Sequence, residues 1–275
     1  MYGYSFNFNH GVLSSGGGGG ASYLLDTYGS AKVAFALHQL SSTATLSCRV
    51  RRSSDNAEQD IGFVGGELDT TSLLSFVGAN DGLVVKMYDQ SGNGNDVFQA
   101  TGNSQRYIVQ SGVLVTYGIN GKTSTLRRNQ YSGLDLTTHL AQTSEHTTFL
   151  VTDHDGTTES HGIAGNTLPY PIQITTSEAL RFYDTALLNF GTITTGEKII
   201  GSYRKSDSKV RMLQNGALFG SELTASTLSG SNYTQIFDRA NTANQYSSTV
   251  ILWESDLSAN INDISTILNN YYGIY

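Results

Sequence analysis

The segment "YDQSGNGND", residues 88–96, gathers many polar functional groups in a short stretch. Its nine positions hold a tyrosine, two aspartates, two asparagines, a serine, a glutamine and two glycines. Such a set could form a catalytic loop, a metal-binding loop, a sugar-binding loop or a turn. It follows the strand-like run "LVVKMYDQ" and interrupts all regular periodicity, so it lies where a strand ends.

A second polar segment, "TDHDGTTESHG" at 152–162, offers possible metal ligands. Its imidazole and carboxylate groups are His154, His161, Asp153, Asp155 and Glu159. Such groups bind transition metals, but their spacing here matches no metal motif such as HExxH. The abundance of Gly, Thr and Ser is typical of a surface loop that follows a strand. We therefore expect no bound metal and no cofactor.

Other catalytic patterns find weak support. No GxSxG elbow is present, although a Ser/His/Asp triad stays open in a serine-rich chain. The pentaglycine at 16–20 is not a phosphate loop, because no Lys-Ser/Thr follows it. Glycosidase chemistry needs two carboxylates about 5.5 Å apart for retention or about 6.5–9.5 Å apart for inversion. The chain has 23 acidic residues, and the sequence does not show which pair converges.

The composition indicates the scaffold that must position these groups. Among 275 residues there are 30 glycines and 16 tyrosines, and only 14 % of the residues are charged. Short strands separated by Gly, Asn and Ser turns produce this profile, and sandwiches and barrels are the usual result. The sequence therefore predicts an all-β fold.

The charge and hydropathy patterns argue against two kinds of partner. The formal net charge is −7, so the positive footprint of a nucleic-acid-binding protein is missing. The basic cluster "RVRR" at 49–52 is followed at once by the acidic "SSDNAEQD". No apolar run approaches the roughly 18 residues needed to span a bilayer, and the N-terminus does not resemble a secretory signal. We expect neither nucleic-acid binding nor membrane insertion.

The only cysteine in the sequence, Cys48, excludes an intrachain disulfide framework. Its neighbours predict a strand, in which a small buried thiol is the ordinary arrangement.

The pentaglycine at 16–20 marks the boundary between an N-terminal segment and the rest of the chain. Residues 1–20 end in the pentaglycine, which nothing restrains in φ and ψ. Before it, aromatic residues alternate with small or polar ones: Tyr2, Tyr4, Phe6 and Phe8. The segment is either a disordered tail or an arm that docks on a partner chain. Residues 21–275 are expected to form one domain.

Periodicity predicts helices at three places. Val33, Leu37 and Leu40 share a stripe, which predicts a helix over about 30–40 capped by Ser30. A second helix is expected over about 69–78, capped near Asp69. A third near the C-terminus carries Ile261, Ile264 and Leu268, with Ser258 as cap and Gly273 as stop. Most other segments read as strands, including a meander over 198–220 with an Asn-Gly hairpin turn.

Three motifs in order carry a family resemblance: "RVRRSSDNAEQDIGF", the helix "LDTTSLLSFV" and "YDQSGNGND". Together they resemble the catalytic domain of the arabinofuranosidase B family, a β-sandwich related to concanavalin A-like lectins and glucanases. With "SGGGGG" and "LLDTY" in front of them, they are more similar still to copies of this domain in bacteriophage structural proteins. The resemblance covers roughly residues 13–100 and implies a concanavalin A-like jelly-roll sandwich with a few short peripheral helices.

The chain departs from the enzymes of that family at the catalytic positions. The family uses a vicinal cysteine pair, which Cys48 alone cannot form. The counterpart of the nucleophilic glutamate is Asp184 in "ALRFYDTA", one methylene shorter. The counterpart of the general acid is Asp238 in "IFDRANTANQ", without the flanking glycines. The resemblance thus leaves Asp184 and Asp238 as the catalytic candidates if the chain is an enzyme.

Because "YDQSGNGND" is present where the catalytic residues are altered, we expect an architectural role for it. Asp89 and Asn93 can form Asx-turns, Gly92 and Gly94 can supply positive φ, and Tyr88 can pack inward at the end of its strand.

The sequence hypothesis is a non-enzymatic bacteriophage virion protein, either a tail, fibre or capsid-surface component, assembled in the host cytoplasm. In this hypothesis the arm binds other virion proteins, the chain forms a homo-oligomer, and the sandwich binds host surface glycans at residues that the sequence does not identify. The alternatives are a glycoside hydrolase of arabinofuranosidase type acting on surface polysaccharide, and a cellular lectin.

Overall fold

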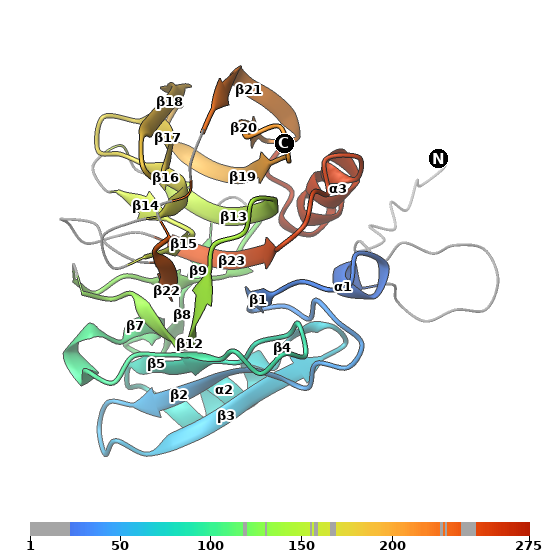
Figure 1. The fold of residues 1–275 in the computed structure, drawn as a ribbon. Helices are drawn as coiled ribbons and strands as arrows, with labels where there is room; N and C mark the ends of the chain where they lie inside the picture. Colours follow the sequence, from blue (N-terminus) through green and yellow to red (C-terminus); the bar gives the residue numbers. More distant parts are fainter. Residues whose placement is uncertain are drawn as a thin grey trace, which may run out of the picture.

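The computed structural model describes residues 23–117, 120–129, 131–154, 156, 159–165, 169–225, 228, 230–237 and 246–275. Across these residues the chain is almost entirely β-structure with three short α-helices (Figure 1). None of the helices in the described ranges is long and apolar enough to cross a membrane. The predicted docking arm, with Tyr2, Tyr4, Phe6 and Phe8, lies outside the described residues.

The first layer of the sandwich is an antiparallel sheet in which each strand pairs with the next. Its strands in spatial order are β21 (Ala217–Thr224), β20 (Lys209–Gln214), β19 (Gly196–Arg204), β13 (His146–His154), β23 (Tyr246–Trp253) and β1 (Val33–Ala36). The Asn-Gly turn predicted for the meander is present between β20 and β21, since Asn215 and Gly216 both have positive φ (51° and 77°).

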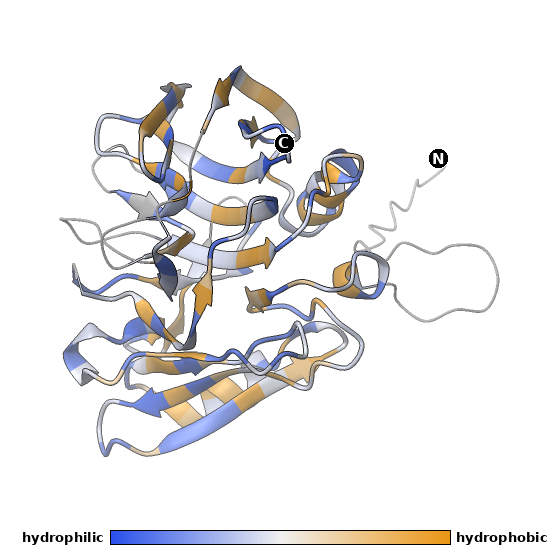
Figure 2. Cartoon of the chain, in the orientation of Figure 1, coloured by the Kyte–Doolittle hydropathy of each residue, from blue (hydrophilic) through white to orange (hydrophobic). Residues whose placement is uncertain are grey.

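Both faces of the first layer are covered, and successive residues of a strand point to opposite faces. On β13, Leu150 belongs to the inner core, while Phe149 and Val151 belong to a separate outer core. The helix α3 (Ile261–Tyr272) and the short α1 (Leu24–Thr27) cover the outer face (Figure 1). β13, β23 and α3 accordingly contain hydrophobic residues, coloured orange in Figure 2.

The second layer packs on the inner face and is built from two runs of paired strands. The first run is β4 (Glu67–Leu68), β3 (Glu58–Val64), β2 (Leu46–Arg52), β5 (Gly82–Met87), β7 (Arg106–Gln110) and β8 (Val113–Leu114). The second run begins where β6 (Val97–Phe98) pairs with β5. It continues in spatial order with β12 (Leu134–Ala141), β22 (Asn232–Ile236) and β15 (Ile163–Ala164). The strand β11 (Thr125–Leu126) pairs with both β23 and β7 and joins the layers.

A smaller sheet completes the cover of the inner core beside β13 and β19 (Figure 1). Its strands are β14 (Ser160–His161), β16 (Tyr170–Ile174), β17 (Ala179–Tyr183) and β18 (Leu187–Thr192). The remaining elements are the ribbon of β9 (Thr116–Tyr117) and β10 (Lys122–Thr123), the 3-10 turn η1 (Gly102–Ser104) and α2 (Thr70–Val77). The predicted all-β sandwich with short peripheral helices is confirmed.

Two of the three predicted helices are present. α2 begins after Asp69, whose carboxylate accepts the backbone N–H of Ser72 at 2.9 Å, as predicted for a cap. α3 ends at Gly273 with φ of 64°, also as predicted. Its N-cap is Asn260 rather than Ser258.

The helix predicted over 30–40 is wrong, because Val33–Ala36 forms the strand β1. All four residues of β1 are buried, with Val33 and Phe35 in the inner core and the two alanines in the outer core. A short run that is apolar on both faces fits a helix or a strand equally well by periodicity. Pairing with β23 decides for the strand, and Ser30 has a left-handed φ of 62° instead of acting as a cap.

The loop 88–96 satisfies the edge of β1 that faces away from β23. The Asp89 carboxylate accepts the backbone N–H of Ala34 at 2.9 Å. It also accepts the backbone N–H groups of Ser91 (3.0 Å) and Asn95 (3.1 Å) and the Ser91 hydroxyl (2.8 Å). One carboxylate therefore closes the loop on itself and fixes it to the strand.

Gln90 continues this pairing beyond β1. Its backbone N–H donates to the carbonyl of Ala34 at 2.9 Å. Its side-chain amide donates to the carbonyls of Ala36 (2.9 Å) and His38 (3.0 Å), while its oxygen accepts the N–H of Leu40 at 2.7 Å. Only 3 % of Gln90 is exposed, so these bonds are shielded from water. Two side chains thus replace a neighbouring strand.

The other members of the loop shape its turn. Gly92 and Gly94 have φ of 86° and 70°, a region that β-branched residues resist. The Asn93 amide donates to the carbonyl of Ala31 at 2.8 Å. Tyr88 is half-buried and its hydroxyl donates to Asp60 at 2.7 Å, so it lies outside both hydrophobic cores instead of packing inward.

We predict that Asp89→Ala lowers the free energy of unfolding by about 2 kcal/mol, because the buried N–H of Ala34 and the half-buried donors of Ser91 and Asn95 lose a charged acceptor. Urea denaturation measures this, with Glu58→Ala as control, since Glu58 is an exposed carboxylate on β3. An Asp89→Ala variant that unfolds like the wild type but no longer binds glycans would instead identify 88–96 as a recognition loop.

Candidate functional site

Asp184, the predicted nucleophile position, lies in the turn between β17 and β18. Its backbone N–H donates to the carbonyl of Ala186 at 3.3 Å, which tightens the turn. Only 1 % of the residue is exposed. The carboxylate is therefore held inside the sandwich rather than on the rim of a surface loop.

Tyr233 on β22 lies beside this carboxylate and is 3 % exposed. Burial, and then the negative charge of Asp184, raise the pKa of the Tyr233 phenol above its ordinary value. Arg204 at the end of β19 also acts on this phenol, in the opposite direction. The guanidinium donates to the carbonyls of Ser144 at 3.1 Å and Ala225 at 2.8 Å. A carboxyl group, a phenol and a guanidinium are thus gathered between the sheets.

His146 completes the group from the first residue of β13, where it pairs in register with Arg204. Its ring stacks on Phe182 of β17 with centroids 5.8 Å apart, so it bridges the first layer and the small sheet. Burial, and then the positive charge of Arg204, lower the pKa of His146 to about 3. Neither ring nitrogen has a hydrogen-bond partner among the described residues. The imidazole is therefore neutral at pH 7 and offers one N–H donor and one acceptor nitrogen for hydrogen bonds.

We call Asp184, His146, Arg204 and Tyr233 the inter-sheet cluster. Titratable groups with shifted pKa values around a buried carboxyl are typical of sites that perform acid-base chemistry or bind a polar ligand. The sequence reasoning found Asp184 only through the family resemblance, and it missed the other three residues. Strand alternation was the available signal. His146 lies four residues before Leu150 and Arg204 four residues after Ile200, so each faces the inner core like its partner.

The second acidic candidate, Asp238, lies outside the described residues. Among the candidate metal ligands of 152–162, Asp155 also lies outside them. His154 and His161 are both buried, and the His161 ring stacks on Tyr170 with centroids 4.5 Å apart. In the described ranges no three His, Cys, Asp or Glu side chains are grouped closely enough to hold a metal ion.

Cys48 lies on β2, in the second layer, and is fully buried. Burial raises the pKa of its thiol to about 12, so the reactive thiolate is not formed at neutral pH. Arg49 of the same strand pairs with Asp60 at 2.7 Å, and Arg52 pairs with Asp55 at 2.6 Å. Two of the three arginines of the basic cluster are therefore paired with the acidic segment that follows them, and the third, Arg51, donates to the Gln105 and Asn56 side chains.

Comparison with known proteins supports the fold. No family model matches the chain, and no curated protein matches it. Among solved structures, a GH54 α-L-arabinofuranosidase soaked with a cyclic sulfate inhibitor superposes on 89 % of this chain with a TM-score of 0.63 and 17 % identity. A mutant of a GH54 α-L-arabinofuranosidase soaked with 4-nitrophenyl α-L-arabinofuranoside gives 0.62 and 18 % over the same share.

An arabinofuranosidase complexed with arabinofuranosyl-α-1,2-xylobiose also covers 89 % of this chain, with a TM-score of 0.64 and 16 % identity. This chain spans 63 % of the length of each of these three proteins. At such low identity the likeness establishes a shared β-sandwich fold.

We predict that His146 makes the fold sensitive to acid. The folded state keeps the imidazole neutral, whereas the unfolded chain takes up a proton below the ordinary pKa of about 6.5. The free energy of unfolding should therefore fall as the pH drops from about 6.5 toward about 3. Between pH 7 and pH 5 this single group contributes a loss of about 2 kcal/mol.

Urea denaturation of His146→Phe at both pH values tests this, since phenylalanine keeps the stacking but cannot titrate. The variant should lose less stability on acidification than the wild type. His139→Phe is the control, because His139 is exposed on β12. An unchanged pH dependence in His146→Phe would contradict a buried neutral imidazole.

Proposed function

We propose that this chain is a carbohydrate-active module of the arabinofuranosidase type that hydrolyses arabinose-containing polysaccharide. The observation that carries the proposal is a buried carboxyl, Asp184, gathered with three titratable side chains inside a sandwich that superposes on arabinofuranosidases over 89 % of its length. Two of those proteins were studied with arabinofuranosyl compounds bound or soaked. The departure from the hypothesis of a non-enzymatic virion protein rests on this likeness.

In the proposed reaction Asp184 is the nucleophile and Asp238 the general acid, the roles that the family resemblance gives to their positions. Asp184 attacks the anomeric carbon while Asp238 protonates the leaving glycosidic oxygen, and water then hydrolyses the glycosyl-enzyme. Tyr233, on whose phenol both Asp184 and Arg204 act, is the polar neighbour of Asp184, and His146 pairs in register with Arg204. Because aspartate is one methylene shorter than glutamate, the sugar must approach the β17–β18 turn closely.

A second candidate function is glycan binding without hydrolysis, in a virion component such as a tail, fibre or capsid-surface protein. Two observations support it as the second candidate. The single cysteine is buried on β2 in the second layer and cannot form the family's cysteine pair. Asp184 itself is 1 % exposed, so a sugar has little access to it in this conformation.

We predict release of arabinose from arabinan or aryl α-L-arabinofuranosides by the purified chain. Asp184→Asn and Asp238→Asn should each lower the rate by about a hundredfold or more, since each removes a group that acts at the reacting bond. Asp263→Asn is the control, because Asp263 is an exposed residue on α3. Glycan binding with no turnover above background would favour the second candidate.

The second candidate makes its own prediction for the arm. A segment of about 15 residues loses roughly 1–2 kcal/mol of backbone entropy per residue on ordering. Burial of Tyr2, Tyr4, Phe6 and Phe8 on a neighbour's sheet edge would offset this. Deletion of residues 1–20 should then leave the melting temperature nearly unchanged but abolish oligomerisation, measured by analytical ultracentrifugation. Unchanged assembly of the deleted protein would count against a docking arm.

A further inference from the structure

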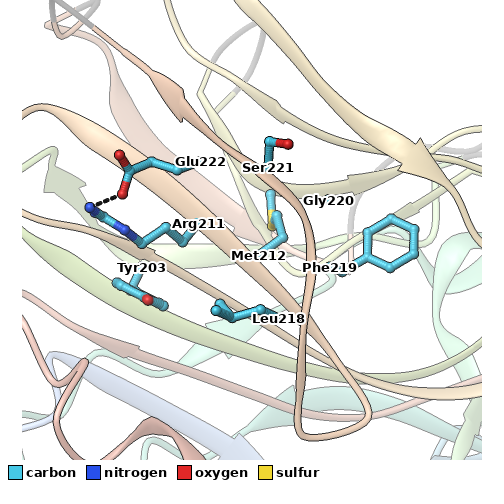
Figure 3. A pocket seen from close by; sticks show the side chains of 8 residues that line it. All are labelled: Tyr203, Arg211, Met212, Leu218, Phe219, Gly220, Ser221 and Glu222. Atoms are coloured by element: carbon cyan, nitrogen blue, oxygen red, sulfur yellow. Dashed lines mark ion pairs between the residues drawn. The ribbon is translucent and has the colours of Figure 1, made fainter.

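A cavity of about 120 Å³ opens between β19, β20 and β21. Its lining includes the side chains of Tyr203, Arg211, Leu218, Ser221 and Glu222 (Figure 3). Tyr203 belongs to the outer core, whereas the next residue, Arg204, belongs to the inter-sheet cluster on the inner face. On β19, the cavity therefore uses the outer face and the inter-sheet cluster uses the inner face. Met212 and Phe219, which also line the cavity, belong to or pack against the inner core.

A β-bulge creates this cavity. Val210 pairs with Leu223 and Met212 pairs with Phe219, so the single residue Arg211 lies opposite the three residues 220–222. A bulge of this kind bends the strand and re-aims side chains, and bulges are common beside binding sites. We call the hollow at residues 220–222 the bulge pocket.

Gly220 fixes the bulge. Its φ is 71°, and a Cβ added there would lie 2.2 Å from the carbonyl oxygen of Phe190 on β18. Only glycine can therefore hold this backbone against the small sheet. The shape of the pocket is imposed by packing between two sheets and not by a free loop.

The polar wall of the bulge pocket is formed by Arg211 and Glu222, which belong to a network of four paired charges. Glu222 uses one oxygen for Lys209 and the other for Arg211, as the dashed line of Figure 3 shows for Arg211. Arg211 also pairs with Asp207 at 3.0 Å. The network holds two positive and two negative groups, so its formal charge is zero. It presents fixed donors and acceptors without attracting an ion of either sign.

The other wall is apolar. Leu218 is 68 % exposed, one of the most exposed large hydrophobic residues in the described chain. Beneath the network, the Arg211 guanidinium lies 5.7 Å from the centre of the Tyr203 ring, which supports its orientation. A sugar ring has a matching character, with C–H groups on one face and vicinal hydroxyls at its edge. Fixed charged donors and acceptors make the stronger hydrogen bonds to such hydroxyls.

We propose that the bulge pocket binds one unit of a neutral polysaccharide and serves as a non-catalytic attachment site. Neutral glycans are favoured over anionic ones because the network has no net charge. The choice of arabinose as the unit rests on the proposed function, whereas the saccharide class rests on the pocket alone. A polysaccharide held here stays on the outer face of the first layer and leaves the inter-sheet cluster free.

The test uses the full chain with an α-1,5-L-arabinan backbone oligosaccharide, linear arabinan, xylan and β-glucan as probes. Titration monitored by ¹⁵N-¹H NMR should shift the amides of Gly220, Ser221 and Glu222 with at least one probe. Glu222→Gln and Leu218→Ser should each weaken that binding by about tenfold, measured by calorimetry. Glu222 belongs to the polar wall and Leu218 to the apolar wall. If one variant fails to fold, the other still tests the site.

Matched controls are Glu58→Gln and Val64→Ser, an exposed carboxylate and an exposed apolar residue on β3. Both should bind like the wild type, and Asp184→Asn should keep the bulge binding even if it abolishes hydrolysis. Hydrolysis without amide shifts at 220–222 overturns this inference and leaves the proposed function standing. Amide shifts at 220–222 without turnover support this inference and overturn the proposed hydrolytic function. Binding of none of the four probes, or unchanged affinity in both pocket variants, also overturns the inference.

Discussion

The hydrogen bonds between the loop 88–96 and the edge of β1 are the constraint on which the rest of the structure depends. β1 is buried on both faces, so its backbone groups have no access to water and must be paired. β23 satisfies one edge, and the Asp89 and Gln90 side chains satisfy the other. With β1 fixed, the row β1–β23–β13–β19 has a defined end, and that row carries His146 and Arg204 inward and Tyr203 outward.

Much of the fold was predictable because it is encoded locally. The Asp69 cap, the Gly273 stop and the Asn-Gly turn at 215–216 each arise from the chemistry of one or two residues, and all three are present. β1 could not be assigned in this way. Its run of buried residues fits a helix equally well, and the groups that select the strand lie on β23 and in the loop 88–96, far away in the sequence.

The inter-sheet cluster was less predictable for the same reason. Its residues come from β13, β19, β22 and the β17–β18 turn, which meet only through register and layer packing. A sequence shows that an arginine or histidine stands at an inward position of a strand, but the pairing of His146 with Arg204 depends on the register of two long strands. The family resemblance supplied Asp184 because that residue has a counterpart in a motif. His146, Arg204 and Tyr233 have no such motif around them.

Cys48 has a practical consequence. As the sole thiol in the chain, fully buried between paired strands, it is shielded from alkylating reagents as long as β2, β3 and β5 remain together. The rate at which a maleimide or iodoacetamide modifies Cys48 in the native protein therefore reports how often the second layer opens locally. Cys48 is therefore a native probe of local unfolding in the second layer, and no engineered cysteine is needed to measure it.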